Sequence, residues 1–183
     1  MAFKRYAIDG YGQLELNNVA FRRDGRIEAQ CGLDATDFAS VPAENGMVLA
    51  VDKVNKAVKF VEDGSKLPVA INFSSEHMYD ERKSGLKDFK IDYDASGYFL
   101  PRMGYLAIGD LFTTNCIGYD DAEWTDDEKF KEAVKGGLYA APSAEGAWAV
   151  SATAAESGCV AEVVKAFTMP DGQFAVQLRV IQL

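Results

Sequence analysis

The clearest pattern of hydrophobic and polar positions lies near the end of the chain. From Gln173 to Val180 the residues alternate strictly, with Phe174, Val176, Leu178 and Val180 on one face. Alternation with a period of two is typical of a strand that buries one face. Val160–Phe167 is also β-prone, and Met169–Gly172 between the two runs has the Pro and Gly of a type I turn. We therefore predict a C-terminal hairpin.

Short β-prone runs also fill the middle of the chain. Met47–Val51 and Ala57–Val61 are separated by a turn at Asn55, which predicts a hairpin. Val69–Phe73 follows Pro68 closely, so the three runs together indicate an antiparallel meander. Further strands are expected in three places: Gly104–Ile108, Leu111–Ile117 and Ala147–Val150.

One segment has the signals of a helix. Thr125 and Glu128 form a capping box, in which each side chain reaches the other residue's backbone N–H. Phe130 and Val134 lie four residues apart on one face, and two glycines follow at 136 and 137. We predict a short helix near Thr125–Lys135 that packs on a sheet. The predicted fold class is mainly β: an antiparallel β-barrel or sandwich with one short helix and an extended N-terminal arm.

Two segments depart from the strand pattern. Residues 1–45 are polar and irregular, so we predict an extended arm that packs on the body of the same chain or on a neighbouring subunit. Residues 46–183 form the predicted β-rich domain. Within it, residues 74–101 form a long inserted loop that mixes charges with aromatic rings. Such a loop is often a binding element, although its rings can equally pin it to its own core.

The charge balance narrows the class of partner. The formal net charge is −9, which argues against nucleic acid and anionic membranes as partners, because phosphate binding depends on Lys and Arg. Arg22, Arg23 and Arg26 are the one basic cluster, and they surround a predicted solvated turn at Asp24 and Gly25. The longest apolar stretch is far shorter than the roughly 20 residues of a membrane span. No apolar run follows Lys4 and Arg5, so we expect a protein made and kept in a cytoplasm.

No residue pattern indicates catalysis or a cofactor. Cys31, Cys116 and Cys159 are scattered and read as buried apolar residues. The lone histidine, His77, lies in the charged loop without a triad pattern. Asp92, Asp94, Ser96 and Gly97 begin like a calcium loop, but Met103 stands where the bidentate Glu should be. We therefore predict no catalytic residue, no metal site and no cofactor, and interpret Asp92–Gly97 as a tight turn.

Four segments carry a resemblance to a known class: Glu44–Lys53, Gly104–Thr114, Gly146–Val150 and Met169–Gln173. Together they resemble the virion proteins of tailed bacteriophages, in particular head-decoration or minor capsid proteins. In small β-barrel decorators, a strand beginning with Gly-Asp follows a tight turn, and a strand with Gly-x-Trp and a closing Pro-Asp-Gly hairpin come later. The long loop and the helix lie outside that minimal pattern.

The resemblance implies a non-enzymatic protein at the virion head surface. Its partners would be the major capsid protein and neighbouring copies of itself, with no direct contact to nucleic acid or membrane. It would bridge capsid subunits and stabilise the head. The predicted contact residues are apolar or aromatic side chains of the arm and the loop: Phe3, Tyr6, Leu14, Leu16, Phe21, Tyr79, Phe89, Tyr93, Tyr98 and Phe99.

Two alternatives remain open from the sequence. The first is a tail or head–tail connector subunit, which would close into rings by itself. The second is a small-molecule-binding or hydrolytic β-barrel that acts through the acidic loop around Asp92 and Asp94. Ring formation favours the connector, and metal-dependent turnover favours the enzyme.

Overall fold

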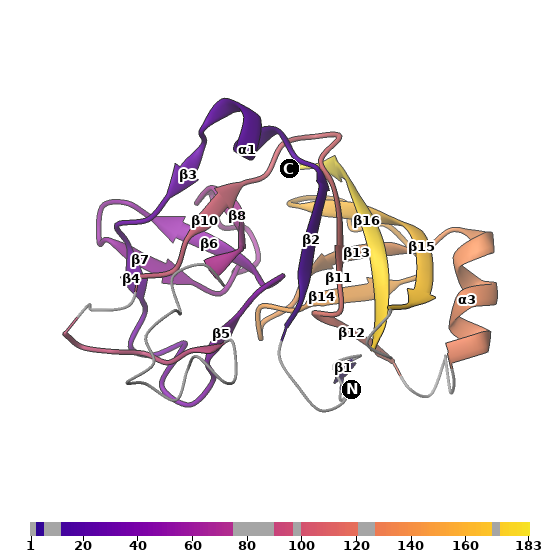
Figure 1. Cartoon of the computed structure of the whole chain (residues 1–183), viewed down its shortest axis with the longest axis horizontal. Coiled ribbons are helices and arrows are strands. Elements are labelled where there is room, and N and C mark those ends of the chain that lie inside the picture. The colour runs from indigo at the N-terminus through magenta and orange to yellow at the C-terminus, as the bar shows by residue number, and fades with distance from the viewer. Residues whose placement is uncertain (1–2, 6–11, 75–89, 97–99, 121–126, 170–172) are drawn as a thin grey trace.

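The strands of the protein form two main sheets that lie side by side in the computed structural model (Figure 1). The structure describes residues 3–5, 12–74, 90–96, 100–120, 127–169 and 173–183. The strands are β1 (Phe3–Arg5), β2 (Leu14–Asn18), β3 (Ile27–Glu28), β4 (Gly32–Leu33), β5 (Ala43–Glu44), β6 (Val48–Asp52), β7 (Ala57–Lys59), β8 (Val69–Asn72), β9 (Lys90–Ile91), β10 (Met103–Tyr105), β11 (Leu111–Thr114), β12 (Ile117–Asp120), β13 (Tyr139–Pro142), β14 (Trp148–Ser151), β15 (Val160–Thr168) and β16 (Phe174–Gln182). The helices are α1 (Ala20–Asp24) and α3 (Asp127–Gly136).

The two main sheets are open, and they share a core. The larger has the order β1-β12-β14-β13-β15-β16-β11-β2, and the smaller has the order β3-β10-β8-β6-β7-β4. A third, two-stranded sheet pairs β5 with β9. The described strands do not close a barrel, so of the two predicted architectures the sandwich-like one fits.

Strand β6 explains how the layers are stacked. All five of its residues are buried, as expected for a strand covered on both faces. Val48 joins the first core, which it shares with Phe112 and Trp148 of the larger sheet. Leu49 faces a second core with Phe38. The continuous apolar run from Met47 to Val51 therefore reflects a strand between two apolar layers rather than a half-exposed one.

The C-terminal hairpin and the helix are confirmed. β15 and β16 pair antiparallel along most of their length, and the predicted turn at residues 170–172 lies outside the described residues. Helix α3 ends one residue after the predicted Lys135. Its Phe130 is fully buried and meets the ring of Phe174 edge-on, with 6.0 Å between centroids. The helix packs on β15 and β16 as its apolar face predicts.

The middle hairpin is confirmed, but the next two strands belong to different sheets. β6 pairs antiparallel with β7 and with β8, so it lies between them, and the predicted meander, in which β8 would follow β7 in the sheet, is wrong. β10 continues this six-stranded sheet, whereas β11 joins the larger one. The chain crosses between the sheets through a tight turn at Gly109, whose φ of 92° favours glycine.

Residues 14–45 of the predicted arm pack on the body of the same chain, which is one of the two arrangements expected from the sequence. β2 pairs antiparallel with β11 of the same chain. Phe21 is fully buried, and a Cβ at Gly104 would lie within 2.4 Å of its ring, so Phe21 fills the space that this glycine leaves. Cys31, Leu33 and Phe38 cover the second core. Most of the large apolar residues of this segment therefore pack against a core of their own chain, whereas Ile27 is 39% exposed.

Among the described residues, neither helix is long and apolar enough to cross a bilayer.

Candidate functional site

A buried network of polar groups lies where the two sheets meet. The carboxyl group of Glu44 is 3% exposed and accepts a hydrogen bond of 2.5 Å from the backbone N–H of Gly12. The next residue, Asn45, accepts a hydrogen bond of 2.7 Å from the backbone N–H of Ser74 through its side-chain oxygen. The neighbouring side chains of Glu44 and Asn45 thus bind the backbone at residues 12 and 74, which are far apart in the sequence.

The same network continues into the larger sheet. The side-chain oxygen of Asn115 accepts from the N–H of Gln13 at 2.6 Å, and its amide donates to Gln173 at 2.7 Å. Thr114 donates its hydroxyl to the carbonyl of Gln13 at 2.8 Å. Trp148 donates its indole N–H to the carbonyl of Gly46 at 3.2 Å. Buried polar groups need such partners, and these bonds fix how the two sheets meet.

A second feature is a rigid turn that exposes an apolar side chain. Val54, at the tip of the β6–β7 hairpin, is 91% exposed. The carboxyl group of Asp52 accepts the backbone N–H groups of Val54 and Asn55, each at 3.0 Å. It also accepts the side-chain amide of Asn55 at 2.6 Å. The hydrogen bond from the Asn55 backbone is the main reason why the pKa of Asp52 is lowered. The turn is therefore ordered around an exposed valine.

A similar turn joins β10 to β11. Ile108 at its tip is 69% exposed. The buried carboxyl group of Asp110 accepts the N–H of Ala107 at 2.8 Å and the N–H of Ala20, at the start of α1, at 2.7 Å. The backbone N–H of Gly109, in the same turn, donates to the carbonyl of Val180 at 2.8 Å. This turn therefore lies beside α1 and the C-terminal end of β16, at one end of the molecule (Figure 1).

The basic cluster of the sequence lies at that same end. Arg22 and Arg23 belong to α1, and Arg26 follows it. All three are exposed. Asp24 lies 3.2 Å from Arg23 and 4.0 Å from Arg26, so it balances one of the three charges. We call Arg22, Arg23, Arg26 and Ile108 the basic end.

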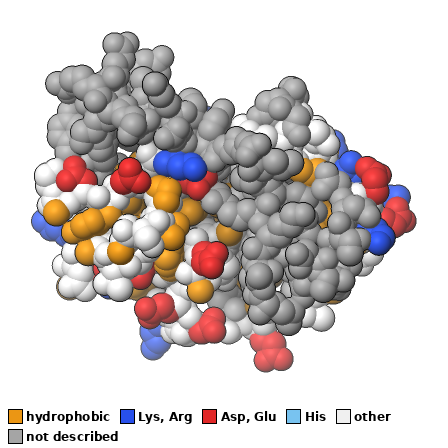
Figure 2. Space-filling view, turned by 90° about the horizontal axis from the view of Figure 1, so that it is seen from below, with side chains coloured by type: hydrophobic (Ala, Val, Ile, Leu, Met, Phe, Trp, Pro, Cys, Tyr) orange, Lys and Arg blue, Asp and Glu red, His pale blue; other side chains and the backbone are white. Residues whose placement is uncertain are grey.

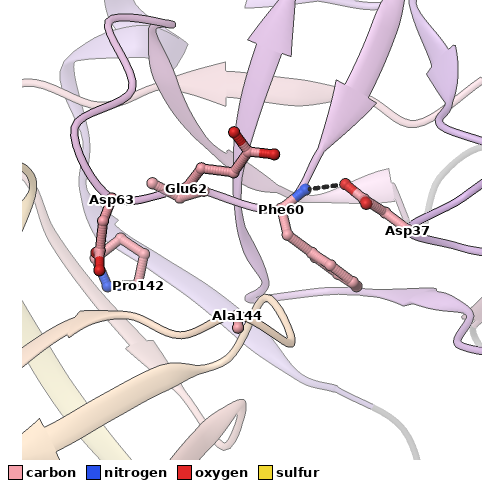
Figure 3. Close-up of a pocket in the computed structure, with 7 residues that line it drawn as sticks. Asp37, Phe60, Glu62, Asp63, Pro142 and Ala144 are labelled. Atoms are coloured by element: carbon pink, nitrogen blue, oxygen red, sulfur yellow. Dashed lines mark hydrogen bonds between the residues drawn. The ribbon is translucent and has the colours of Figure 1, made fainter.

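The described surface also contains a pocket with acidic walls. It has a volume of about 390 Å³ and is lined by Asp37, Phe60, Val61, Glu62, Asp63, Pro142 and Ala144. Asp37 accepts the N–H of Phe60 at 2.8 Å. Figure 3 places Asp37 and Asp63 on opposite sides of the opening, with Phe60 and Glu62 between them. We call this feature the acidic pocket.

A close backbone contact shapes the acidic pocket. Gly146 has a φ of 77°, and a Cβ there would lie 3.2 Å from the ring of Phe60. The positive φ and the short distance both favour glycine at residue 146, where the turn between β13 and β14 approaches the end of β7. The pocket lies between segments of the two different sheets.

The described cysteines are poorly suited to nucleophilic chemistry. Burial raises the pKa of Cys31, and Glu28 raises it further. Burial raises the pKa of Cys159 to about 12. A thiol must ionise before it can attack, and a raised pKa keeps both of these thiols protonated at neutral pH, so both are poor nucleophiles.

Glu28 also interacts with Lys53 at 3.6 Å, and that amino group lies 5.1 Å from the Tyr105 ring centroid. This cluster joins β3, β6 and β10 as a structural contact.

The acidic loop forms the tight turn that the sequence predicts. Asp94 accepts the backbone N–H of Ser96 at 2.9 Å and its hydroxyl at 2.7 Å. Among the described residues, no group of three or more His, Cys, Asp or Glu side chains is placed to hold a metal ion. His77 and Gly97 lie outside the described residues.

The structure places only part of the predicted contact set. Leu14 and Leu16 are half-buried against the first core, and Phe21 is inside it. Tyr93 is 39% exposed. Phe3 lies in β1, where it pairs with Asp120. The others lie outside the described residues: Tyr6, Tyr79, Phe89, Tyr98 and Phe99.

Sequence reasoning missed Val54 and Ile108 as contact candidates. Both adjoin turn-forming residues: Val54 stands between Asp52 and Asn55, and Ile108 directly precedes Gly109 and Asp110. An apolar residue inside a turn motif is the signal that identifies such positions, because turns usually expose polar side chains.

Comparison with known proteins adds no relative. Neither a protein-family model, nor a curated protein, nor a solved structure matches this chain at a significant level.

Proposed function

We propose that this chain is a non-enzymatic structural protein of a bacteriophage virion, which docks on the shell of major capsid protein and stabilises the head. The observation that carries the proposal is Val54, an exposed apolar side chain on a turn that Asp52 holds rigid. A turn with this arrangement presents a side chain to a partner rather than to its own core.

Rigidity matters because docking orders both surfaces. Immobilising a flexible loop costs binding free energy, whereas a turn already fixed by three hydrogen bonds avoids most of that cost. Decoration requires many copies to bind the same capsid lattice. A small gain in binding free energy at each contact is therefore multiplied over the whole shell. The ordered valine tip meets this requirement.

The surface around the six-stranded sheet suits a broad contact as well. Figure 2 shows hydrophobic side chains gathered over the left half of the molecule, where Figure 1 places that sheet, with Asp and Glu side chains around them. An apolar centre inside a polar rim is the usual anatomy of a protein interface. Tyr93 and the predicted loop aromatics remain contact candidates of the same proposal.

The described thiols and the turn at Asp94 are compatible with the structural role. The raised pKa values of Cys31 and Cys159 remove the nucleophilic form at neutral pH. The turn at Asp94 and Ser96 uses its oxygen atoms for its own hydrogen bonds. We therefore assign these groups a role in folding.

Labelling of purified virions tests the location. Antibodies against this chain should decorate the head in electron micrographs, in a regular array. Label confined to the tail or to the neck would replace the proposal with the connector alternative. Virions without any label would remove the structural role altogether.

A further inference from the structure

We propose that copies of this chain bind one another head to tail, with the basic end of one copy seated on the acidic pocket of the next. The inference deepens the proposed structural role, because it names the surface through which neighbouring copies meet. It concerns only the contacts between copies, whereas the proposed contact with the capsid is made by the Val54 turn.

The charge distribution is the first argument. A net charge of −9 makes identical copies repel one another, so self-association needs a local region of opposite sign. Arg22, Arg23 and Arg26 supply that region, and they are exposed on one short segment. The pocket supplies its counterpart in Asp37, Glu62 and Asp63. Complementary charges of this kind orient two proteins as they meet.

Apolar complementarity is the second argument. Ile108 projects from the basic end on an ordered turn, and it is 69% exposed. The pocket offers Phe60, Pro142 and Ala144 as an apolar lining between its carboxyl groups. A volume of about 390 Å³ equals that of on the order of ten water molecules, so the pocket admits a protruding side chain.

Preorganisation is the third argument. One carboxyl group, that of Asp110, bonds both to Ala107 in the Ile108 turn and to Ala20 at the start of α1. The isoleucine and the arginines are therefore held as one unit. On the other side, Gly146 fixes the approach of the β13–β14 turn to Phe60. Both surfaces are built by backbone and buried contacts of the described chain.

The geometry of such a contact determines the assembly. The basic end and the acidic pocket share no residue, so each copy offers one of each. A contact between two different surfaces is heterologous, and it gives a closed ring or an open chain rather than a two-fold dimer.

Charge reversal at the two surfaces provides the test. In sedimentation velocity at low salt, the wild type should self-associate, and R22E/R23E should weaken that association at least tenfold. E62K/D63K should weaken it to a similar extent. The four substitutions combined should restore association, because the charges are exchanged rather than lost. Added salt should weaken the wild-type contact, because exposed charges are screened.

Matched variants separate the contact from net charge and folding. K135E/K165E makes the same change in charge at exposed positions away from both surfaces and should leave association unchanged. Ile108→Ser and Ala144→Trp test the apolar part without changing charge, and each should weaken association. Circular dichroism should show the same folded spectrum for all these variants.

Two results would overturn the inference. One is a wild type that stays monomeric at the highest soluble concentration. The other is an association that both reversals leave intact, or that the combined variant fails to restore. Binding of heads by a monomeric variant such as R22E/R23E would show that the proposed function stands without the head-to-tail contact. If the combined variant associates again but binds no heads, the head-to-tail contact stands and the proposed function does not.

Discussion

Glu44 holds Gly12 by a hydrogen bond of 2.5 Å inside the junction of the two sheets, although 32 residues separate them. A Cβ at Gly12 would lie 2.3 Å from the carbonyl oxygen of Asn45, so the two backbone segments lie too close together for any side chain at residue 12. The N-terminal segment is thereby anchored to the segment that leads into β6. A buried carboxyl group thus fixes how the start of the described chain meets the body.

Substituting Glu44 by alanine should lower the free energy of unfolding by about 1–3 kcal/mol, because the buried N–H of Gly12 loses its acceptor. Chemical denaturation measures this loss. Limited proteolysis should also cut the variant earlier than the wild type in the N-terminal segment.

Glu15→Ala is the matched control, because Glu15 is exposed in the neighbouring strand β2. It should change stability by less than about 0.5 kcal/mol. Equal stability of the Glu44 and Glu15 variants would show that the junction does not depend on this hydrogen bond.

Phe21→Ala should destabilise the protein by about 3–5 kcal/mol, because it empties a buried site against Gly104 and Phe73. Removal of residues 1–24 should cause a still larger loss. Thermal melting followed by circular dichroism is the measurement. A truncated protein that melts like the wild type would show that residues 1–24 do not contribute to the stability of the body.

The arm shows where sequence reasoning fails. Phe21 and Phe38 each lie in a short, mixed stretch of apolar and polar residues, so neither belongs to a long periodic stripe that marks a buried face. Their burial depends on partners far along the chain, such as Gly104 for Phe21 and Phe60 for Phe38, whose ring centroids are 4.8 Å apart. By contrast, the alternation from Phe174 to Val180 is local, and the C-terminal hairpin was predictable from it.

The cysteines should resist alkylation in the folded state. With a pKa of about 12, Cys159 has a thiolate fraction on the order of 10⁻⁴ at pH 8, and Cys31 is also shifted upward. Burial adds a steric barrier for all three thiols. Mass spectrometry after brief iodoacetamide treatment should detect almost no modified native protein, and full modification in denaturant. Rapid labelling of the native chain would contradict these buried positions.

Acid should weaken the turn that carries Val54. The pKa of Asp52 is lower in the folded chain than in the unfolded one, so its contribution is present above the unfolded value, near 4, and is lost as pH falls through the folded value. Asp34 is shifted in the same direction, chiefly by its hydrogen bond from Thr36. Denaturation curves between pH 7 and about 2 should therefore show falling stability.

Asp52→Asn isolates the contribution of this one carboxyl group. The variant should be less stable than the wild type at pH 7, and the difference should shrink as the pH falls. A difference that is independent of pH would show that the charge of Asp52 does not hold the turn.

The candidate contact surfaces were harder to predict than the strands. The basic cluster was visible in the sequence, but its position beside Ile108 depends on Asp110 bonding to two segments. The acidic pocket joins residues 37, 60–63, 142 and 144, which no local pattern connects. Local periodicity predicts elements, whereas a surface built from several elements follows only from their packing.

Head binding tests the central claim most directly. The proposed function predicts that bacteriophage heads stripped of this chain cosediment with the purified wild-type protein and become more resistant to heat. Val54→Asp should abolish binding while retaining the wild-type melting temperature, and Lys135→Asp should bind like the wild type. A wild-type chain that stays in the supernatant with such heads, or a Val54→Asp variant that binds as well as wild type, would contradict the account.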